Sequence, residues 1–264
     1  MEENNIKNLI NLSEAEINNL LQSNDKLNLI KSEDKYLFAI YLIGIGKYDN
    51  GILLLKNLTK INKNSTESIE VQKCYDIKAK YKLGTMYLTG IDNIECDKEK
   101  AYFYLRQIRD DYFIQEKLKN RDNIDEMAKD VIINEYCDTL KHFGDFYKDG
   151  TMVLQDLCIA KKYYGNFVRI KLSNLKKLPK DMQDIEKNSI KDEYIVSMLE
   201  LEKVRLKQAI ALNCSFDRVF QQMTESEKER VILEKYNKKL RELESVNMSA
   251  IDDFGGLDGV TKVI

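Results

Sequence analysis

The chain has 264 residues, of which 43% are hydrophobic, 33% are charged and only one, Pro179, is proline. So few turn-forming residues exclude a loop-rich all-β sandwich and favour an all-α fold, and the apolar content excludes disorder throughout the chain. Because 42 basic residues nearly balance 44 acidic ones, the net charge of −2 does not attract nucleic acid or an anionic membrane.

The first predicted element is a helix that begins at Ser13. Ser13 and Glu16 have the spacing of a capping box, and Leu12 and Ile17 occupy the positions of a hydrophobic staple. Arrays of helices need terminal elements that cover their apolar edges. We therefore expect residues 1–29 to cap the helical units that follow.

The middle of the chain contains a repeated pattern, with one good copy in residues 79–104 and another in residues 139–163. The matching positions are Ala79, Leu83, Gly84, Tyr87, Gly90, Asp97, Ala101 and Tyr104 in the first copy, and Thr139, Phe143, Gly144, Tyr147, Gly150, Asp156, Ala160 and Tyr163 in the second. The pattern predicts two helices joined by a loop in each copy.

Each position has a physical reason. Ala79, Leu83 and Tyr87 recur every four residues and form one face of the first helix. Gly84 and Gly144 have no side chain, which lets a second helix approach closely. The later glycine of each copy ends the first helix in the left-handed conformation, and the aspartate caps the second helix. One such hairpin cannot bury its own core, so we expect neighbouring hairpins to stack.

A weaker copy occupies residues 37–56, where Leu37, Tyr41 and Gly44 match the pattern. The repeated pattern resembles the Sel-one-like repeat family, a relative of the tetratricopeptide repeat. What the resemblance implies is a right-handed α-solenoid of helix–loop–helix repeats, which we place at residues 30–178.

The two good copies are 60 residues apart, which exceeds the usual repeat length of that family. The insert between them has helical patterning. We expect additional helix around residues 111–119 and again in the segment that leads into Cys137.

The repeat pattern ends at the single proline, and residues 179–247 are predicted to form an extension of two long helices. The first covers residues 181–213, and the second opens with a capping box formed by Thr224 and Glu227. The two helices either fold back on the solenoid or form an arm that pairs with another chain, which includes a homo-oligomer. Residues 248–264 are rich in glycine and aspartate and predict a flexible tail.

Charge is segregated at the start of this extension. Residues 161–180 contain seven Lys or Arg and no acid, whereas residues 181–202 contain seven acids and two Lys. One interpretation is a basic patch for nucleic acid or for an acidic partner. We favour the other, in which the two segments pack against each other, since the neighbouring segment has the complementary charge.

Motifs for catalysis and metal binding are missing from the sequence. His142 is the only histidine, the five cysteines form no CxxC pair, and the glycines of residues 44–51 lack P-loop spacing. We expect no catalytic residue, no metal and no cofactor. The N-terminus lacks a secretory signal and the longest apolar stretch, residues 36–45, is too short to span a bilayer, so we expect a cytoplasmic protein without membrane insertion.

What the Sel-one-like resemblance implies for function is protein–protein interaction, as an adaptor or scaffold that binds a partner on the concave face of the solenoid. Aligning the two good copies places Lys82 with His142 and Thr85 with Asp145 at exposed positions of that face. These four residues are the predicted partner contacts. An alternative is a dedicated inhibitor or immunity protein that binds a single toxin or enzyme. An enzyme with an unrecognised site is a third possibility, which a cluster of exposed carboxylates in the groove would favour.

Overall fold

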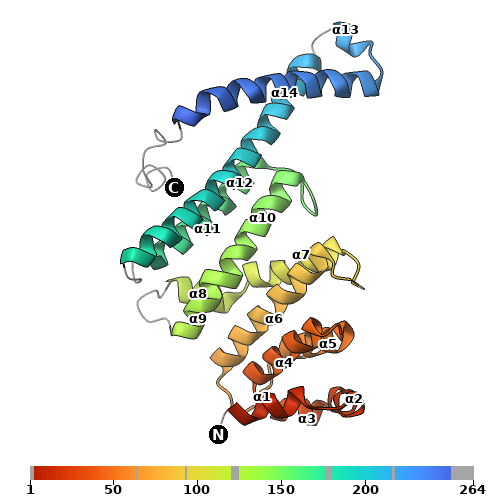
Figure 1. Cartoon of the computed structure of the whole chain (residues 1–264), viewed down its shortest axis with the longest axis vertical. Helices are drawn as coiled ribbons and strands as arrows, with labels where there is room; N and C mark the ends of the chain where they lie inside the picture. The colour runs from red at the N-terminus through yellow and green to blue at the C-terminus, as the bar shows by residue number, and fades with distance from the viewer. Residues whose placement is uncertain are drawn as a thin grey trace. The chain divides into compact units, whose positions relative to one another are not determined.

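The computed structural model describes residues 3–63, 65–92, 94–119, 125–175, 180–215 and 218–250. Within these ranges the secondary structure is helical, apart from one isolated antiparallel bridge between Ile91 and Ile94, so the predicted all-α class is confirmed there (Figure 1). None of the described helices joins bilayer-spanning length to a sufficiently apolar sequence. The chain divides into two compact units, Met1–Thr139 and Leu140–Ile264, and the division falls inside the predicted 30–178 region.

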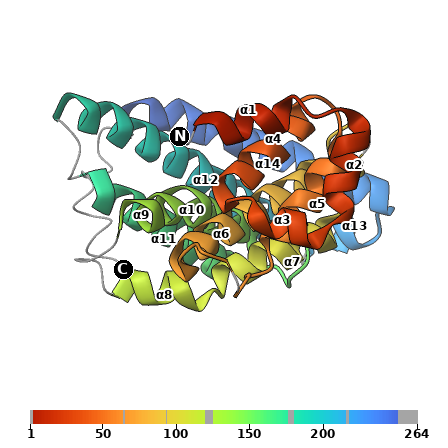
Figure 2. The ribbon, with the colours of Figure 1, turned by 90° about the horizontal axis from the view of Figure 1, so that it is seen from below.

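The first unit begins with short helices that cover a central layer. Its elements are α1 (Glu3–Ile10), α2 (Glu14–Gln22), α3 (Asn24–Leu29), α4 (Ser32–Gly44), α5 (Tyr48–Leu58), α6 (Ile69–Thr89), α7 (Lys98–Arg109), α8 (Tyr112–Lys119), α9 (Glu126–Val131) and the π-helical segment η2 (Ile132–Tyr136). α4, α5 and α6 pack side by side (Figure 2). Their inward faces form a core around Phe38, Leu54 and Leu83, each of which is fully buried.

The predicted capping box at the start of α2 is present. The Ser13 N–H donates to the Glu16 carboxylate at 2.8 Å, and the Glu16 N–H donates to the Ser13 hydroxyl at 3.4 Å. α1 packs on α4 and α2 packs on α5. The N-terminal helices therefore contact the first hairpin, as terminal elements of a helical array do.

The α4–α5 hairpin differs from the pattern predicted for residues 37–56. Leu37 is 46% exposed, and Gly44 lies inside α4 with open space around it. The glycine with the left-handed backbone is Gly46, at φ +81°. Close packing depends on Gly51 of α5, where an added methyl group would lie 2.9 Å from a backbone carbonyl oxygen of α4. The glycine predicted to end the first helix of this copy was therefore wrong by two residues, and the small residue at the helix contact sits on the second helix instead of the first.

The α6–α7 hairpin has the geometry that the first good copy predicts. An added methyl group at Gly84 would lie 2.9 Å from the Leu105 side chain of α7, so the two helices are in close contact there. Gly90 follows the last residue of α6 in the left-handed region, at φ +68°. Asp97 caps α7 by accepting a 2.9 Å hydrogen bond from the backbone N–H three residues on.

The second unit contains the second good copy. Its elements are α10 (Cys137–Asp149), which begins at the end of the first unit, α11 (Leu157–Leu175), α12 (Lys180–Ser215), α13 (Arg218–Gln221) and α14 (Glu225–Ala250). An added methyl group at Gly144 of α10 would overlap the ring of Tyr164 on α11. Gly150 has φ +68°, and the Asp156 carboxylate accepts a 2.9 Å hydrogen bond from the Ile159 N–H at the start of α11.

Two further contacts recur in both hairpins. The rings of Tyr87 and Tyr104 stack with centroids 6.1 Å apart, and those of Tyr147 and Tyr163 stack with centroids 5.6 Å apart. In each hairpin the capping aspartate also donates its N–H to the carbonyl oxygen of the first tyrosine, at 2.8 Å and 2.9 Å respectively. The 60-residue repeat in sequence is therefore also a repeat of tertiary contacts between α6–α7 and α10–α11.

The insert between the two hairpins is helical, as the sequence predicts. α8 covers almost the whole of residues 111–119, and η2 runs directly into Cys137, the first residue of α10. α9 packs on α6. The extra length of this repeat is thus filled by helices that belong to the first unit.

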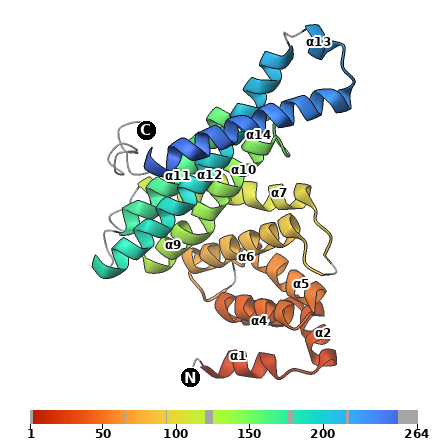
Figure 3. The ribbon, with the colours of Figure 1, turned by 45° about the horizontal axis from the view of Figure 1, so that its top comes forward.

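The two long C-terminal helices are also present, as α12 and α14. α14 opens with the predicted capping box, in which the Thr224 N–H donates to the Glu227 carboxylate at 2.9 Å. α12 packs along α11 and α14 packs across α12 (Figure 3). The basic α11 and the acidic first half of α12 are therefore packed together, as their complementary charges predict. Of the predicted tail, residues 248–250 continue α14 and the remainder lies outside the described residues.

Candidate functional site

The four residues predicted to contact a partner are all half-buried. Lys82 and Thr85 lie on α6 in the first unit, where the Thr85 hydroxyl donates to the Lys82 carbonyl oxygen at 3.0 Å. His142 and Asp145 lie on α10 in the second unit. The Asp145 carboxylate accepts a 2.7 Å hydrogen bond from the Tyr164 hydroxyl. The structure thus brings Lys82 and Thr85 together on α6, and it gives Asp145 a role in packing α10 against α11.

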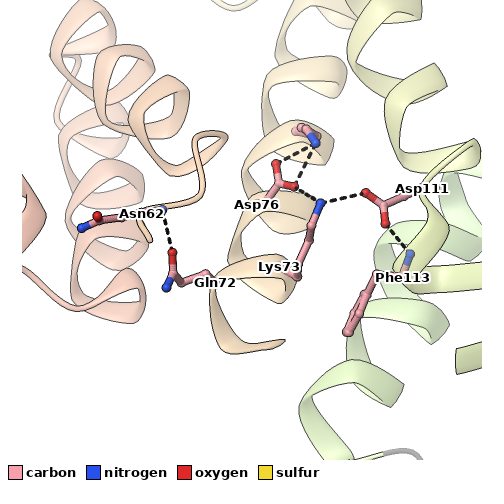
Figure 4. Close-up of polar contacts among 7 residues, drawn as sticks. Asn62, Gln72, Lys73, Asp76, Asp111 and Phe113 are labelled. Carbon is pink, nitrogen blue, oxygen red and sulfur yellow. Dashed lines mark hydrogen bonds and ion pairs between the residues drawn. The ribbon is translucent and has the colours of Figure 1, made fainter. Parts of the chain in front are cut away.

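A buried ion network, which the sequence did not indicate, lies between α6 and the start of α8 (Figure 4). Asp76 has only 1% of its side chain exposed and lies 2.7 Å from the Lys80 Nζ. The Lys73 Nζ lies 3.4 Å from Asp76 and 3.4 Å from Asp111. Asp111 in turn accepts a 2.9 Å hydrogen bond from the Phe113 N–H in the first turn of α8. Two lysines and two aspartates therefore tie α6 to α8.

The electrostatics of this network are balanced. Burial raises the pKa of Asp76, and the attraction of Lys80 and Lys73 opposes that rise. Burial acts to lower the pKa of Lys73, but Asp111 and Asp76 outweigh it, so the pKa of Lys73 is raised. Buried ions are tolerated when each faces an opposite charge, whereas removing one partner is strongly destabilising. The network is therefore suited to holding helices together.

The sequence signal for this network was weak. Lys73, Asp76 and Lys80 are three and four residues apart, a spacing that is equally common on exposed helical faces. Nothing in the pattern marks Asp76 as buried, and Asp111 lies 38 residues beyond Lys73 in the chain. Only the packing of α8 against α6 brings it into the network.

A polar pocket lies near the start of α6, where the loop of residues 59–68 joins α5 to α6. Gln72 anchors this loop, because its Oε1 accepts from the Asn62 N–H at 2.8 Å and its Nε2 donates to the Glu67 carbonyl oxygen at 3.2 Å (Figure 4). The Glu67 carboxylate accepts from the Ser32 N–H at 3.0 Å and from the Ser32 hydroxyl at 2.6 Å. Glu67 therefore caps α4 from a distant part of the chain and fixes one wall of the pocket.

A partly buried carboxylate belongs to η2. The Oε2 of Glu135 is buried and accepts no hydrogen bond from the described residues. Burial raises the pKa of Glu135 to about 7, with Lys78 opposing the rise and Asp130 and Asp138 adding to it. The Thr139 hydroxyl donates to the Glu135 carbonyl oxygen at 2.7 Å, which supports the π-helical backbone. π-helical turns recur at functional sites, and the charged neighbours of the Glu135 carboxylate are Lys78, Asp130 and Asp138.

The described residues offer no cluster that would hold a metal ion, and their cysteines differ in exposure. They contain no group of three His, Cys, Asp or Glu side chains placed to hold a metal ion. Cys74, Cys137 and Cys214 are buried, and Cys96 and Cys158 are exposed. Burial raises the pKa of Cys74 to about 12, so its thiol stays protonated and unreactive at neutral pH.

Comparisons with known proteins found no matching family model, no matching curated protein and no matching solved structure. The functional conclusion therefore depends on the repeated hairpins and on the polar groups of each unit.

Proposed function

We propose that this protein is a non-enzymatic adaptor or scaffold that binds another protein or a peptide. The observation that carries the proposal is the repeat of contacts between α6–α7 and α10–α11. In both hairpins a glycine packs against the second helix, a left-handed glycine follows the first helix, and an aspartate caps the second. Such contacts use the inward faces of a hairpin and leave the outer positions of its first helix available for recognition.

In the proposed arrangement the hairpins form a right-handed solenoid of the Sel-one-like kind, and the first helices line its concave face. Lys82, Thr85 and His142 supply mixed charge and polarity on these helices. Mixed chemistry of this kind discriminates between partners better than a uniform charge does. Asp145 contributes indirectly, by holding the Tyr164 hydroxyl.

The test begins with the full chain, which is used to capture a partner whose affinity is then measured in purified form. We expect Lys82→Glu combined with His142→Glu to weaken binding by about tenfold or more, which corresponds to about 1.4 kcal/mol. Lys98→Glu and Lys161→Glu are matched controls, because both lysines are exposed on the second helices of the same hairpins. They are expected to leave the affinity unchanged.

The opposite pattern would refute the proposal. If the double variant binds normally while Val196→Asp, on an exposed position of α12, abolishes binding, the C-terminal helices form the binding surface. A truncation after Leu178 would not show whether the C-terminal helices bind the partner. It would also remove Leu201 of α12, which packs against Tyr164 in the core of the second unit. A captured enzyme that loses its activity on binding would identify a dedicated inhibitor instead of an adaptor.

A further inference from the structure

The pocket at the α5–α6 loop is independent of the repeated contacts. Its volume is about 20 Å³, which is room for about one water-sized group. Its walls are mostly polar and include Ser32, Lys35, Asn57, Asn62, Ser65 and Glu67. A small polar space of this kind selects its occupant by charge and hydrogen bonding.

Lys35 is the group that defines the chemistry of the pocket. It is only 7% exposed, although lysine is rarely buried unless it is paired. Its Nζ donates to the Asn57 Oδ1 at 3.1 Å, and an ammonium group has three N–H donors. Burial lowers the pKa of Lys35, and the attraction of Glu67 does not offset this effect. The single hydrogen bond to Asn57 therefore leaves the ammonium with donors for a further acceptor.

The one carboxylate in the wall is committed elsewhere. Both oxygens of Glu67 accept from the Ser32 N–H, at 3.0 Å and 3.1 Å, and one also accepts from the Ser32 hydroxyl at 2.6 Å. A carboxylate at a helix N-terminus is stabilised by the free N–H groups and the helix dipole. The Ser32 donors are neutral, so Glu67 keeps its negative charge and attracts Lys35. Its oxygens are nevertheless directed to α4, and Lys35 and Lys60 together exceed it by one positive charge at the pocket.

The walls are already held in place. Gln72 fixes the loop through the Asn62 N–H at 2.8 Å and the Glu67 carbonyl oxygen at 3.2 Å. The exposed Lys60 also lines the pocket and adds a second positive charge. Because the site is arranged before binding, little conformational entropy is lost when an occupant enters. The room is too small for a tetrahedral oxyanion with its four oxygens, whereas one oxygen of a carboxylate needs no more space than a water molecule.

We propose that this pocket binds a single carboxylate group, which pairs with the Lys35 ammonium. The nature of the group follows from the donors and the size of the pocket, whereas its origin in a partner protein rests on the proposed function. The two can fail separately, because the carboxylate proposal is tested with small molecules and without any partner.

The experiment follows the backbone amide shifts of Asn57, Asn62 and Ser65 by NMR while sodium acetate replaces sodium chloride at constant ionic strength. We expect saturable shifts with a dissociation constant in the millimolar range, as suits one charge-assisted contact. In Lys35→Met these shifts are expected to disappear, because methionine keeps the length of the side chain and removes the charge. Lys56→Met, an exposed lysine of α5 outside the pocket, is the matched control and should retain them.

The origin of the carboxylate is distinguished by two further probes. Binding of N-acetylglutamate amide indicates an acidic side chain, and binding of N-acetylglycine indicates a chain terminus. Acetate that binds when both larger probes fail indicates a free small acid. The proposal is overturned if the acetate shifts do not saturate, if they persist in a folded Lys35→Met variant, if chloride produces the same shifts, or if a crystal grown in acetate holds only water beside Lys35.

Discussion

Replacing Gly144 by alanine is expected to destabilise the second unit, although alanine gains about 1 kcal/mol over glycine in a helix interior. The added methyl group would overlap the ring of Tyr164. That ring is fully buried, packs against Leu201, and has its hydroxyl held by Asp145 at 2.7 Å. Overpacking costs about 1–3 kcal/mol and a lost hydrogen bond about 1 kcal/mol more. We therefore expect a net loss of about 1–3 kcal/mol after the helix gain is subtracted.

Gly84→Ala is the comparison that isolates the role of the ring. Its methyl group would meet the Leu105 side chain at 2.9 Å, and an aliphatic side chain can change rotamer where a tethered ring cannot. We expect this variant to lose less than about 1 kcal/mol. Urea unfolding of both full-length variants, followed by circular dichroism and by hydrogen exchange of the α10 and α11 amides, provides the measurement. A Gly144→Ala protein as stable as the original chain would refute the close approach of α10 and α11.

Three further predictions concern single groups. Because the pKa of Glu135 is raised from 4.5 to about 7 in the folded state, stability should fall as the pH rises from about 5 to about 8, by up to about 3 kcal/mol. Glu135→Gln should flatten that part of the urea-midpoint profile, and an unchanged profile would contradict the burial of this carboxylate. Asp76→Ala leaves Lys80 without its partner and Lys73 with Asp111 alone, and it should cost about 3 kcal/mol in chemical denaturation, whereas Asp76→Leu with Lys80→Met should recover most of the loss; equal losses would mean that the network is not buried. Asp97→Ala removes the cap of α7 and should cost about 1 kcal/mol, and a thermal midpoint that does not change would argue against this cap.

The hairpins could be predicted because their residues are restricted by local geometry. A left-handed backbone at Gly90 and Gly150 and a capping carboxylate at Asp97 and Asp156 are demands that few residue types meet. The same holds for the box at the start of α2, which depends on two residues three positions apart. Each of these features depends on residues within about one helical turn of one another, so the sequence alone indicates it.

The first hairpin shows where such signals fail. Leu37 and Tyr41 are four residues apart, and so are Phe38 and Leu42, so helical periodicity allows either pair to face the core. The structure buries Phe38 and Leu42. The choice is made by Gly51 on the partner helix, which accepts the inward face of α4 at close range. A contact between two helices therefore decides which face of α4 is buried, and the apolar periodicity of α4 alone does not contain this information.

The polar sites could not be predicted from the sequence for a related reason. Lys35 is one of 34 lysines, and its sequence context does not distinguish it from the exposed ones. Its surroundings come from residues far along the chain, because Asn57 accepts its hydrogen bond and Glu67 lines the same pocket. The four residues predicted from the repeat alignment came from the only part of the chain where two copies could be compared.

The capping of α4 by Glu67 has a consequence for the order of events in folding. The Ser32 N–H has its acceptor 35 residues further along the chain, so this contact at the first turn of α4 forms only when Glu67 has reached its position. We expect the completion of that first turn to be coupled to the docking of the loop that carries Glu67. The rate at which the Ser32 amide proton exchanges with solvent accordingly reports how often that loop detaches, which makes it a single-residue probe of cooperativity in the first unit.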